Sequence, residues 1–377
     1  MQKIYLDNAS TTTLRPEVIL EMTQVLEQEY GNPSSTHSLG RSAKNVLELS
    51  RKSIAKNLNA TAQEIIFTSC GTEANNWILQ SAVKDLKVER IITSKIEHHA
   101  VLYTVLALQQ QHGIQVDYVS VKPNGEIDLT HLVTLLANDK KTLVSLMHVN
   151  NEIGTVLDLH RLGVICKEHN VLFHSDTVQS IGKMDFDLQN LHVDFIVASA
   201  HKFHGPKGVG FAFIRKNSGL QPLFFGGEQE KGLRAGTEAL HQIAGMAKAL
   251  ELSYQNLDQD RKHIETLKKH LWDQLQIHFP GVKYNGDFSG LYTVANILLP
   301  FAKEKTAMIL FHLDMKGIAV SRGSACQSGS IKPSHVLAEL LSESDLVLPS
   351  LRVSFCHYNT TLDVDALIIA LLEIRNN

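Results

Sequence analysis

Short apolar runs alternate with amphipathic stretches through the first two thirds of the chain. Stretches such as 72–86 and 159–170 repeat their apolar residues at the spacing of helices. The apolar runs have the length and the β-branched content of buried strands. They lie at 64–69, 90–94, 114–121, 142–149, 171–176, 194–200 and 208–215. This alternation predicts an α/β fold with a mostly parallel, seven-stranded sheet flanked by helices.

The pattern changes after Gly236. A long helical region covers about 238–277, and the rest of the chain mixes both patterns. Strands are expected at 291–300, 317–325 and 350–358, and helices at 306–317 and 362–375. We therefore predict a smaller α+β lobe joined to the first by a long helix. The large domain is assigned to 15–255, and the small domain to 1–14 and 256–377.

Composition narrows the class of protein. The 377 residues carry a net charge of −3, which gives no basic field for nucleic acid. No apolar run has the length of a membrane span, and the first residues lack a signal-peptide pattern. The four cysteines are far apart in sequence and do not form a disulfide framework. We expect a cytoplasmic protein that does not bind membranes.

Polar residues follow the predicted strands at the points where the strands end. Parallel strands bring their carboxyl ends to one edge of the sheet, where such folds bind ligands. We expect one site to contain most of these residues, although His98 and His99, being adjacent, cannot share one helix face. They are Thr72, His98, His99, Asn151, Asp176, Gln179, Ser199, His201 and Lys202.

Asp176 and Lys202 lie at the ends of apolar strands, where an unpaired charge is costly. A plain ion pair between the two is one interpretation, and Thr72 alone is equally well explained as a helix cap. A single ligand explains them together if it has a phosphate, a protonated ring nitrogen and an aldehyde. Pyridoxal 5'-phosphate has these features, with Lys202 forming the Schiff base and Asp176 facing the ring nitrogen.

Two further residues have the chemistry of a substrate site. Cys326 lies in the small-residue stretch SRGSACQSGS, where a core thiol is not expected, and Arg322 would favour its thiolate. Arg352 follows an apolar run, and its fork suits a carboxylate held by two bonds. The alternative for Arg352 is a strand-edge arginine paired to a neighbour.

The joint order of these motifs is specific, and it resembles the cysteine desulfurases of the NifS/IscS type. These enzymes belong to the aspartate-aminotransferase superfamily of pyridoxal 5'-phosphate enzymes, which has the type I fold. The resemblance covers essentially the whole chain. Its motifs are YLDNASTT (5–12), GNPSSTHSLGR (31–41), FTSCGTEANN (67–76), EHHAV (97–101), MHVNNEIGT (147–155), HSDTVQSIGK (174–183), SAHKFHGPKGVG (199–210), RAGTEA (234–239) and SRGSACQSGSIKPSHVL (321–337).

The resemblance implies a role for each matching residue. Lys202 holds the cofactor and moves the Cα proton, and Cys326 is the nucleophile. The other residues bind the cofactor or the substrate. Gly71, Thr72, Ser199 and His201 bind the phosphate, with Thr237 reaching it from the partner of a homodimer; Asp176 and Gln179 bind the ring nitrogen and oxygen; His98 stacks on the ring; Asn151 and Arg352 bind the substrate carboxylate, and Asn151 also lies near the ring oxygen.

The implied reaction converts L-cysteine to L-alanine through a ketimine of the cofactor and leaves the sulfur on Cys326 as a persulfide. An acceptor protein, either an iron–sulfur scaffold or a tRNA-thiolation enzyme, then receives the sulfur.

The main alternative function is a selenocysteine lyase, or another lyase or transferase of this fold. A metal-dependent hydrolase using His98, His99, His201 and His204 is disfavoured, since no H-E-x-x-H motif occurs. We expect no metal. A non-catalytic protein is disfavoured by the presence of Lys202, Asp176 and Cys326.

The chain departs from the family pattern in places. Cys70 stands where a glycine is more usual, and Arg322 where a small residue is common. The chain ends at Asn377, soon after its last expected helix, so the longer tail with which relatives meet a scaffold is expected to be short or absent. These departures leave open the role of Cys70 and the identity of the sulfur acceptor.

Overall fold

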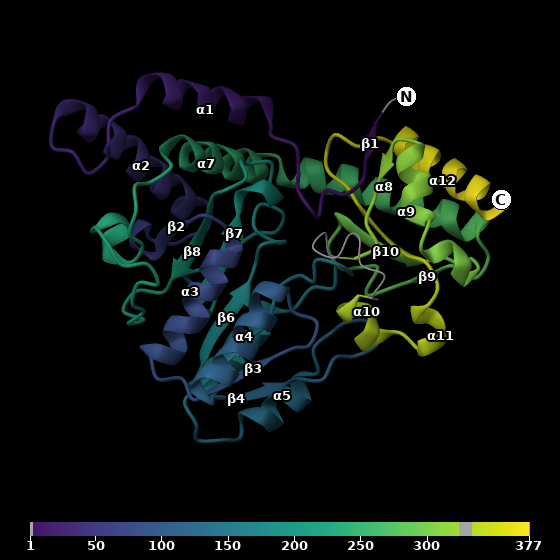
Figure 1. The fold of residues 1–377 in the computed structure, drawn as a ribbon, viewed down its shortest axis with the longest axis horizontal. Helices are drawn as coiled ribbons and strands as arrows, with labels where there is room; N and C mark the ends of the chain where they lie inside the picture. The colour runs from purple at the N-terminus through teal and green to yellow at the C-terminus, as the bar shows by residue number, and fades with distance from the viewer. Residues whose placement is uncertain (1–2, 324–333, 377) are drawn as a thin grey trace.

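The computed structural model describes residues 3–323 and 334–376 and contains the predicted seven-stranded sheet (Figure 1). Its order is β2-β8-β7-β6-β5-β3-β4, and only β8 runs antiparallel to its neighbours. The strands are β2 (Ile65–Thr68), β3 (Arg90–Thr93), β4 (Gln115–Tyr118), β5 (Thr142–Ser145), β6 (Leu172–Asp176), β7 (Phe195–Ser199) and β8 (Gly210–Ile214). The predicted fold class and each of the seven strand assignments are therefore confirmed.

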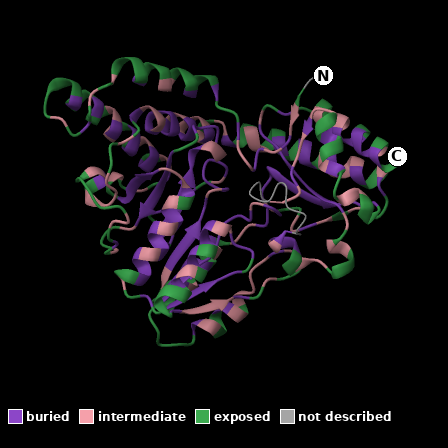
Figure 2. Cartoon of the chain, viewed as in Figure 1, coloured by how far each residue is buried: buried purple, intermediate pink, exposed green. Residues whose placement is uncertain are grey.

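Helices cover both faces of this sheet, so its strands are largely buried, except for the half-buried edge strand β4 (Figure 2). On one face lie α3 (Gly71–Lys84) and α4 (His99–His112); on the other lie α1 (Pro16–Gln28), α2 (Ser38–Asn57), α6 (Leu159–Glu168) and α7 (Leu240–Gln255). Successive strand residues alternate between the two layers. Ile196 packs in the α7 layer, for example, whereas Phe195 and Val197 pack in the α3 layer. Burial on both sides explains why the strands are continuous apolar runs.

A smaller lobe packs around its own hydrophobic core. Its two sheets pair β1 (Ile4–Tyr5) with β11 (Ile318–Ala319), and β10 (Val294–Leu298) with β9 (Lys283–Tyr284) and β12 (Ser350–Ser354). Its helices are α8 (Leu257–His278), α9 (Ile309–Met315), α10 (His335–Leu340), α11 (Glu343–Leu346) and α12 (Thr361–Asn376). The remaining elements of the chain are α5 (Leu129–Leu136) and short 3₁₀ turns at Ala62–Glu64, Ala200–Lys202, Gln229–Gly232 and Lys303–Thr306.

The expected single long helix between the lobes was wrong. The region contains two helices, α7 and α8, because Asn256 leaves helical geometry at φ −106° and ψ 9°. The Asn256 side chain instead donates to the carbonyl oxygen of Leu252 at 2.8 Å. The helical assignment itself, with no strand inside it, was right.

The N-terminal segment connects the two lobes. Leu6 and Ala9 belong to the core of the small lobe, and Val18 to the core of the large one. Between them, Thr12 hydrogen-bonds through both its backbone and its hydroxyl group to the carbonyl oxygen of His201. This packing supports the division into 15–255 and 1–14 plus 256–377, which stays a prediction. In the described part of the chain, no helix combines the length and the apolarity needed to cross a bilayer.

Candidate active site

A cavity of about 240 Å³ lies where β6 and β7 end, and it brings together most of the predicted site. Of the predicted residues, Gly71, Thr72, His98, Asn151, Asp176, Gln179, Ser199, His201, Lys202 and Arg352 line it. The remaining lining is Ala9, Ser10, Cys70, Asn75, Met147 and Val178. Thr237 is exposed and is not part of this lining, and Cys326 lies outside the described residues. Ala9 and Lys202, which are 193 positions apart in sequence, therefore share one pocket with an arginine from the small lobe.

Lys202 is held by the N-terminal segment. It ends the 3₁₀ turn that follows β7, and its Nζ donates to the carbonyl oxygens of Ala9 at 2.7 Å and Ser10 at 2.8 Å. Sequence reasoning missed Ala9 and Ser10, because backbone carbonyls leave no side-chain signal. The small residues of YLDNASTT (5–12) were the available hint, since close approach of a backbone favours small side chains.

Asp176 ends β6 and is 5% exposed. Its Oδ2 accepts from Nδ2 of Asn75 at 2.8 Å, and its Oδ1 accepts from the backbone N–H of Val178 at 3.0 Å. Each oxygen keeps a lone pair after these bonds. Asn75, which sequence reasoning also missed, therefore orients a carboxylate that still has capacity for a proton donor in the cavity.

The start of α3 forms the opposite end of the cavity. The N–H of Gly71 donates to Oγ of Ser199 at 2.7 Å, which leaves the Ser199 hydroxyl hydrogen to donate elsewhere. A side chain at position 71 would not fit, because an added Cβ would lie 2.6 Å from Cγ2 of Val178. With the free N–H groups of the first helical turn, this end suits an anion.

His201 lies beside this helix start, with Nδ1 3.2 Å from Oγ1 of Thr11. Burial, and then the positive charges of Lys202 and Lys207, lower the pKa of His201 to about 4. The imidazole is therefore neutral at pH 7, and it presents one N–H and one lone pair.

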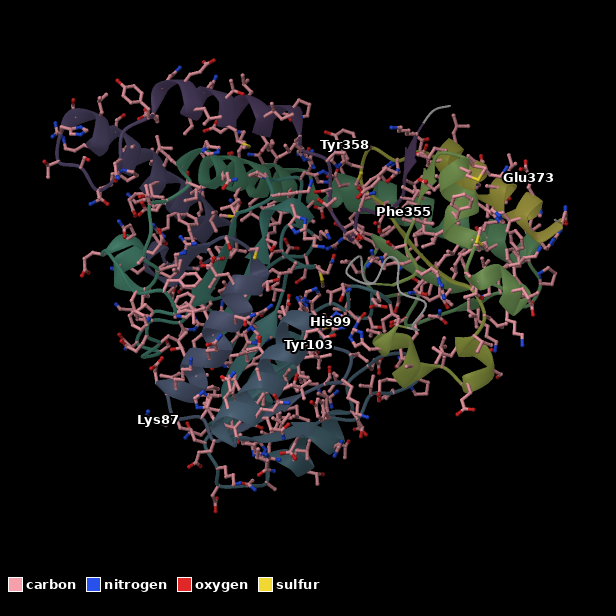
Figure 3. All side chains as sticks on the ribbon, in the orientation of Figure 1. Lys87, His99, Tyr103, Phe355, Tyr358 and Glu373 are labelled. Atoms are coloured by element: carbon pink, nitrogen blue, oxygen red, sulfur yellow. The ribbon has the colours of Figure 1, made fainter. Side chains whose placement is uncertain are left out.

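His98 caps α4, with Nδ1 accepting from the backbone N–H of Ala100 at 3.1 Å. This bond places the ring proton of the neutral form on Nε2. Burial lowers the pKa of His98, while Asp176 opposes that shift and Lys202 reinforces it. Its neighbour His99 does not line the cavity and instead stacks on Tyr103 at 4.7 Å between ring centroids (Figure 3).

Arg352 lies on β12, at the edge of the small-lobe sheet, and both interpretations of it hold in part. Its Nη2 donates to Oδ1 of Asp7 at 2.8 Å and to Oγ of Ser10 at 2.6 Å, and its Nη1 donates to the carbonyl oxygen of Asn151 at 2.9 Å. Its buried Nε has no partner in the described protein. The arginine is thus paired with a neighbour, as the alternative required, and also presents a buried donor where it lines the cavity. Asp7 and Ser10 were not anticipated as its partners.

Comparison with known proteins agrees with this geometry. The model of the aminotransferase class-V family matches residues 4–367. The chain belongs to this family. It is 41% identical to the cysteine desulfurase IscS of Dictyoglomus turgidum over 97% of this chain and 92% of that protein. A solved NifS-like protein is 36% identical, with a TM-score of 0.91 and 99% of both chains covered. The structure of SspA in complex with cysteine is 30% identical, with a TM-score of 0.80, and covers 95% of this chain and 100% of that one. The predicted resemblance to NifS/IscS-type cysteine desulfurases is confirmed.

Members of the aminotransferase class-V family are pyridoxal 5'-phosphate enzymes, and the cavity fits that cofactor. The aldehyde of the cofactor requires an amine, and its ring nitrogen requires a carboxylate with free lone pairs. Its phosphate requires a helix start whose N–H groups can bind an anion. All three line one cavity, at Lys202, Asp176 and Gly71. Gly71 decides the fit, because a side chain at this position would crowd Val178 at the start of α3, where the phosphate would bind.

The histidines of the metal-hydrolase hypothesis do not gather into one site. His201 lines the main cavity, whereas His204 lines a separate one and packs its ring 4.6 Å from that of His357. Within residues 3–323 and 334–376, no three histidine, cysteine or carboxylate side chains are grouped to hold a metal ion. The geometry therefore gives no support to a hydrolase.

Proposed function

We propose that this protein is a cysteine desulfurase that binds pyridoxal 5'-phosphate in the Lys202 cavity. The observation that carries the proposal is the convergence of Lys202, Asp176 and the start of α3 on one pocket. Its relatives include a cysteine desulfurase and a protein solved with cysteine, and L-cysteine is the substrate that we propose here.

The bound cofactor would supply an aldehyde that an amine captures and a ring that accepts electrons. Lys202, held at the carbonyls of Ala9 and Ser10, would capture that aldehyde and later take the proton from the Cα atom of the substrate. Asp176 would keep a proton on the ring nitrogen, and Ser199, Thr72 and His201 would hold the phosphate.

Arg352 would bind the substrate carboxylate through its buried Nε, together with the amide of Asn151. His98 would stack on the ring and, with its proton on Nε2, would exchange protons with the substrate thiol. Cys326 would attack the substrate sulfur as a thiolate. The sulfur would stay on Cys326 as a persulfide, and the carbon skeleton would leave as L-alanine.

The product distinguishes this activity from others on the same fold. We expect the purified protein with added cofactor to form L-alanine from L-cysteine, and the Asp176→Asn variant to lose most of this activity, by about 10²-fold or more. Formation of pyruvate and ammonia in place of L-alanine would identify a lyase. Transfer of the amino group to a 2-oxo acid would identify an aminotransferase. Either result would overturn the proposal.

We also propose that the active unit is a homodimer. Thr237 is exposed and outside the cavity, so a role at the phosphate requires a second copy. The helices α1 and α2 and their connection expose large apolar side chains that a partner would cover. These are Ile19, Leu20, Leu26, Tyr30, Leu39 and Leu49.

Light scattering tests the dimer directly. We expect twice the chain mass of 41.9 kDa and a higher cofactor dissociation constant for Thr237→Ala. A monomer with full activity would contradict the assignment.

The cysteines that the structure describes are unpaired, in keeping with a cytoplasmic location. We propose an iron–sulfur scaffold or a tRNA-thiolation enzyme as the sulfur acceptor.

A further inference from the structure

A second lysine lies directly behind the cofactor cavity. Lys183 follows β6 by seven residues, and its side chain is buried, with the residue 8% exposed. Its Nζ donates to Oε1 of Gln179 at 3.2 Å. Burial, and then the positive charges of Lys202 and Arg352, lower the pKa of Lys183 to about 7, with Cys356 acting in the opposite direction. A cation kept in this place destabilises the fold relative to an apolar side chain of the same size.

The contact with Lys183 determines how the Gln179 amide is turned. Nε2 of Gln179 donates to the carbonyl oxygen of Ala9 at 2.9 Å, and its Oε1 accepts from Lys183. The carbonyl oxygen of Ala9 only accepts, and Lys183 has N–H groups to donate in either protonation state, so the two contacts are satisfied by the same orientation of the amide. In that orientation the oxygen is engaged by Lys183, and one N–H of Gln179 remains for the cavity.

We infer that Lys183 is a positioning residue for the cofactor, which acts by holding the Gln179 amide so that an N–H faces the oxygen on the cofactor ring. The inference rests on the proposed function, because it assumes that the cofactor occupies the Lys202 cavity. Without Lys183, only Ala9 would set the orientation. Oε1 of Gln179 would then lose its donor, and the single bond to Ala9 would hold the amide less firmly in the orientation that turns an N–H toward the ring oxygen.

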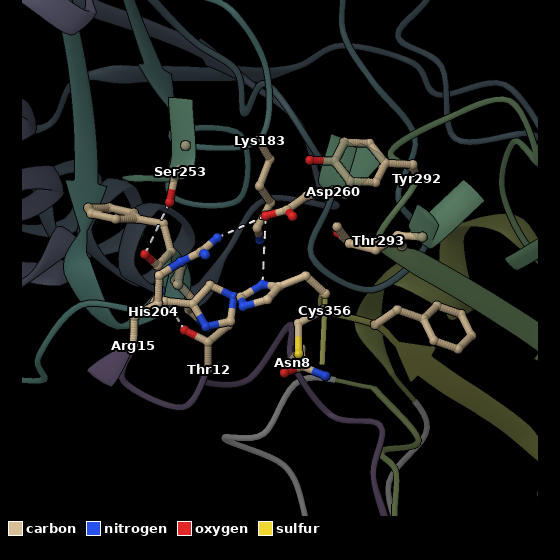
Figure 4. A pocket seen from close by; sticks show the side chains of 16 residues that line it. Asn8, Thr12, Arg15, Lys183, His204, Ser253, Asp260, Tyr292, Thr293 and Cys356 are labelled. Carbon is tan, nitrogen blue, oxygen red and sulfur yellow. Dashed lines mark hydrogen bonds and ion pairs between the residues drawn. The ribbon is translucent and has the colours of Figure 1, made fainter. Parts of the chain in front are cut away.

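The surroundings of Lys183 explain how its charge is tolerated. It lines a second cavity, of about 30 Å³, which Lys202 also lines; Figure 4 shows Lys183 at this cavity. Four buried polar atoms of the lining have no partner among the described residues: Asn8 Oδ1, Arg15 Nε, Thr293 Oγ1 and His357 Nε2. A polar cavity of this size has room for one or two water molecules. Water there would accept the remaining Lys183 hydrogens and keep its head group pointed at Gln179.

The chain offers a matched control for removing this lysine. Lys268 is 4% exposed, donates to the carbonyl oxygen of Leu291 at 3.1 Å and has a pKa lowered by burial to about 8, but it lies on α8 in the small-lobe core. Lys183→Met and Lys268→Met therefore make the same chemical change at equal burial. Only the first touches Gln179.

The measurement is a titration of the cofactor-free proteins with pyridoxal 5'-phosphate, followed by absorbance and combined with thermal unfolding. We expect Lys183→Met to raise the dissociation constant by about 5- to 10-fold, which is the size of one lost hydrogen bond. It should also shift the visible band of the bound cofactor and leave the unfolding temperature unchanged or higher. Lys268→Met should bind the cofactor within about twofold of the parent. Lys183→Gln, which keeps an N–H donor, should recover part of the affinity.

A double-mutant cycle separates this role from a structural one. If Lys183 acts through Gln179, Lys183→Met should add less than about twofold to the loss caused by Gln179→Ala. Effects that multiply, or a Lys183→Met protein with the affinity and spectrum of the parent, would overturn the inference while leaving the proposed function intact. If Lys183→Met does not fold, Lys183→Gln enters the same cycle with the same criterion. A parent protein that binds no cofactor would overturn both proposals.

Discussion

The two cavities that Lys202 lines contain similar residue types and differ most in volume. The small cavity contains Arg15, Asp260, His204 and His357, which are residue types that often act in catalysis. There, Nη2 of Arg15 contacts Oδ2 of Asp260 at 2.8 Å, and Nδ1 of His357 lies 3.7 Å from the same oxygen. The charges neutralise one another in a volume of about 30 Å³, too small for a substrate.

The large cavity leaves its polar groups with unused capacity. Nε of Arg352 has no partner in residues 3–323 and 334–376, Asp176 keeps lone pairs, and Ser199 keeps its hydroxyl hydrogen, in a cavity of about 240 Å³. Polar clusters therefore do not by themselves mark an active site in this protein. Both cavities leave buried polar atoms without a partner among the described residues, so what distinguishes the working cavity is its room for a ligand.

Lys202, which lines both cavities, gives the most severe test of this difference between them. We expect Lys202→Ala to reduce L-alanine formation by about 10²- to 10⁴-fold, because the amine would both hold the cofactor and move the proton. The exposed Lys216, which lines neither cavity, gives the control Lys216→Ala, expected to match the parent. Activity in Lys202→Ala within tenfold of the parent would mean that the chemistry happens elsewhere.

The next effect in size concerns the unpartnered Nε of Arg352. Arg352→Lys keeps the charge but removes the fork, so we expect the KM for L-cysteine to rise about 10- to 100-fold, the equivalent of roughly 1.5–3 kcal/mol. Steady-state kinetics measure it, with the exposed Arg375→Lys as the control. A variant with unchanged KM and lower stability would show that Arg352 serves only its ion pair with Asp7.

The histidines of the small cavity predict a pH dependence of stability. Burial, and then neighbouring charges, lower the pKa of His204 to about 3 and that of His357 to about 4, from an ordinary value of 6.5. As the pH falls below about 6.5, these histidines bind protons in the unfolded chain but stay neutral in the folded chain. Stability is therefore lost toward pH 4. We expect the unfolding temperature of the cofactor-free protein to fall by several degrees from pH 6.5 to 4.5, and His357→Gln to flatten this slope. An unchanged slope in the variant would contradict the assignment.

The smallest effect on activity is expected from the ion pair of the small cavity. Asp260→Asn weakens the contact with Arg15, and we expect it to lower stability by about 2 kcal/mol while the KM for L-cysteine stays within twofold of the parent. Thermal unfolding and kinetics on one preparation measure both, and the exposed Asp258→Asn is the matched control. A tenfold change in KM would erase the distinction between the two cavities.

Much of the fold was predictable because its signals are local. Apart from the half-buried edge strand β4, the strands of the large sheet are buried on both faces and are therefore apolar runs, and the side chains after the runs meet at one edge for topological reasons. The break at Asn256 was missed because the two helices meet there with no glycine or proline between them.

The unpredicted parts of the site are contacts made by the backbone or across the lobes. The carbonyls of Ala9 and Ser10, which hold Lys202, belong to a segment whose side chains give no chemical signal. Asp7 pairs with Arg352 across 345 positions of sequence, a distance over which periodicity carries no information. Lys183 was not singled out from the sequence, because its burial against Gln179 depends on the fold.

The intact mass of the protein after brief exposure to L-cysteine without reductant, measured beside a Cys326→Ala variant, decides whether Cys326 is the sulfur acceptor. We expect the parent to gain one sulfur atom, the variant to gain none, and both to bind the cofactor equally. If neither protein gains sulfur although the parent carries bound cofactor, Cys326 is not the acceptor, and the Lys202 cavity serves another reaction of this family.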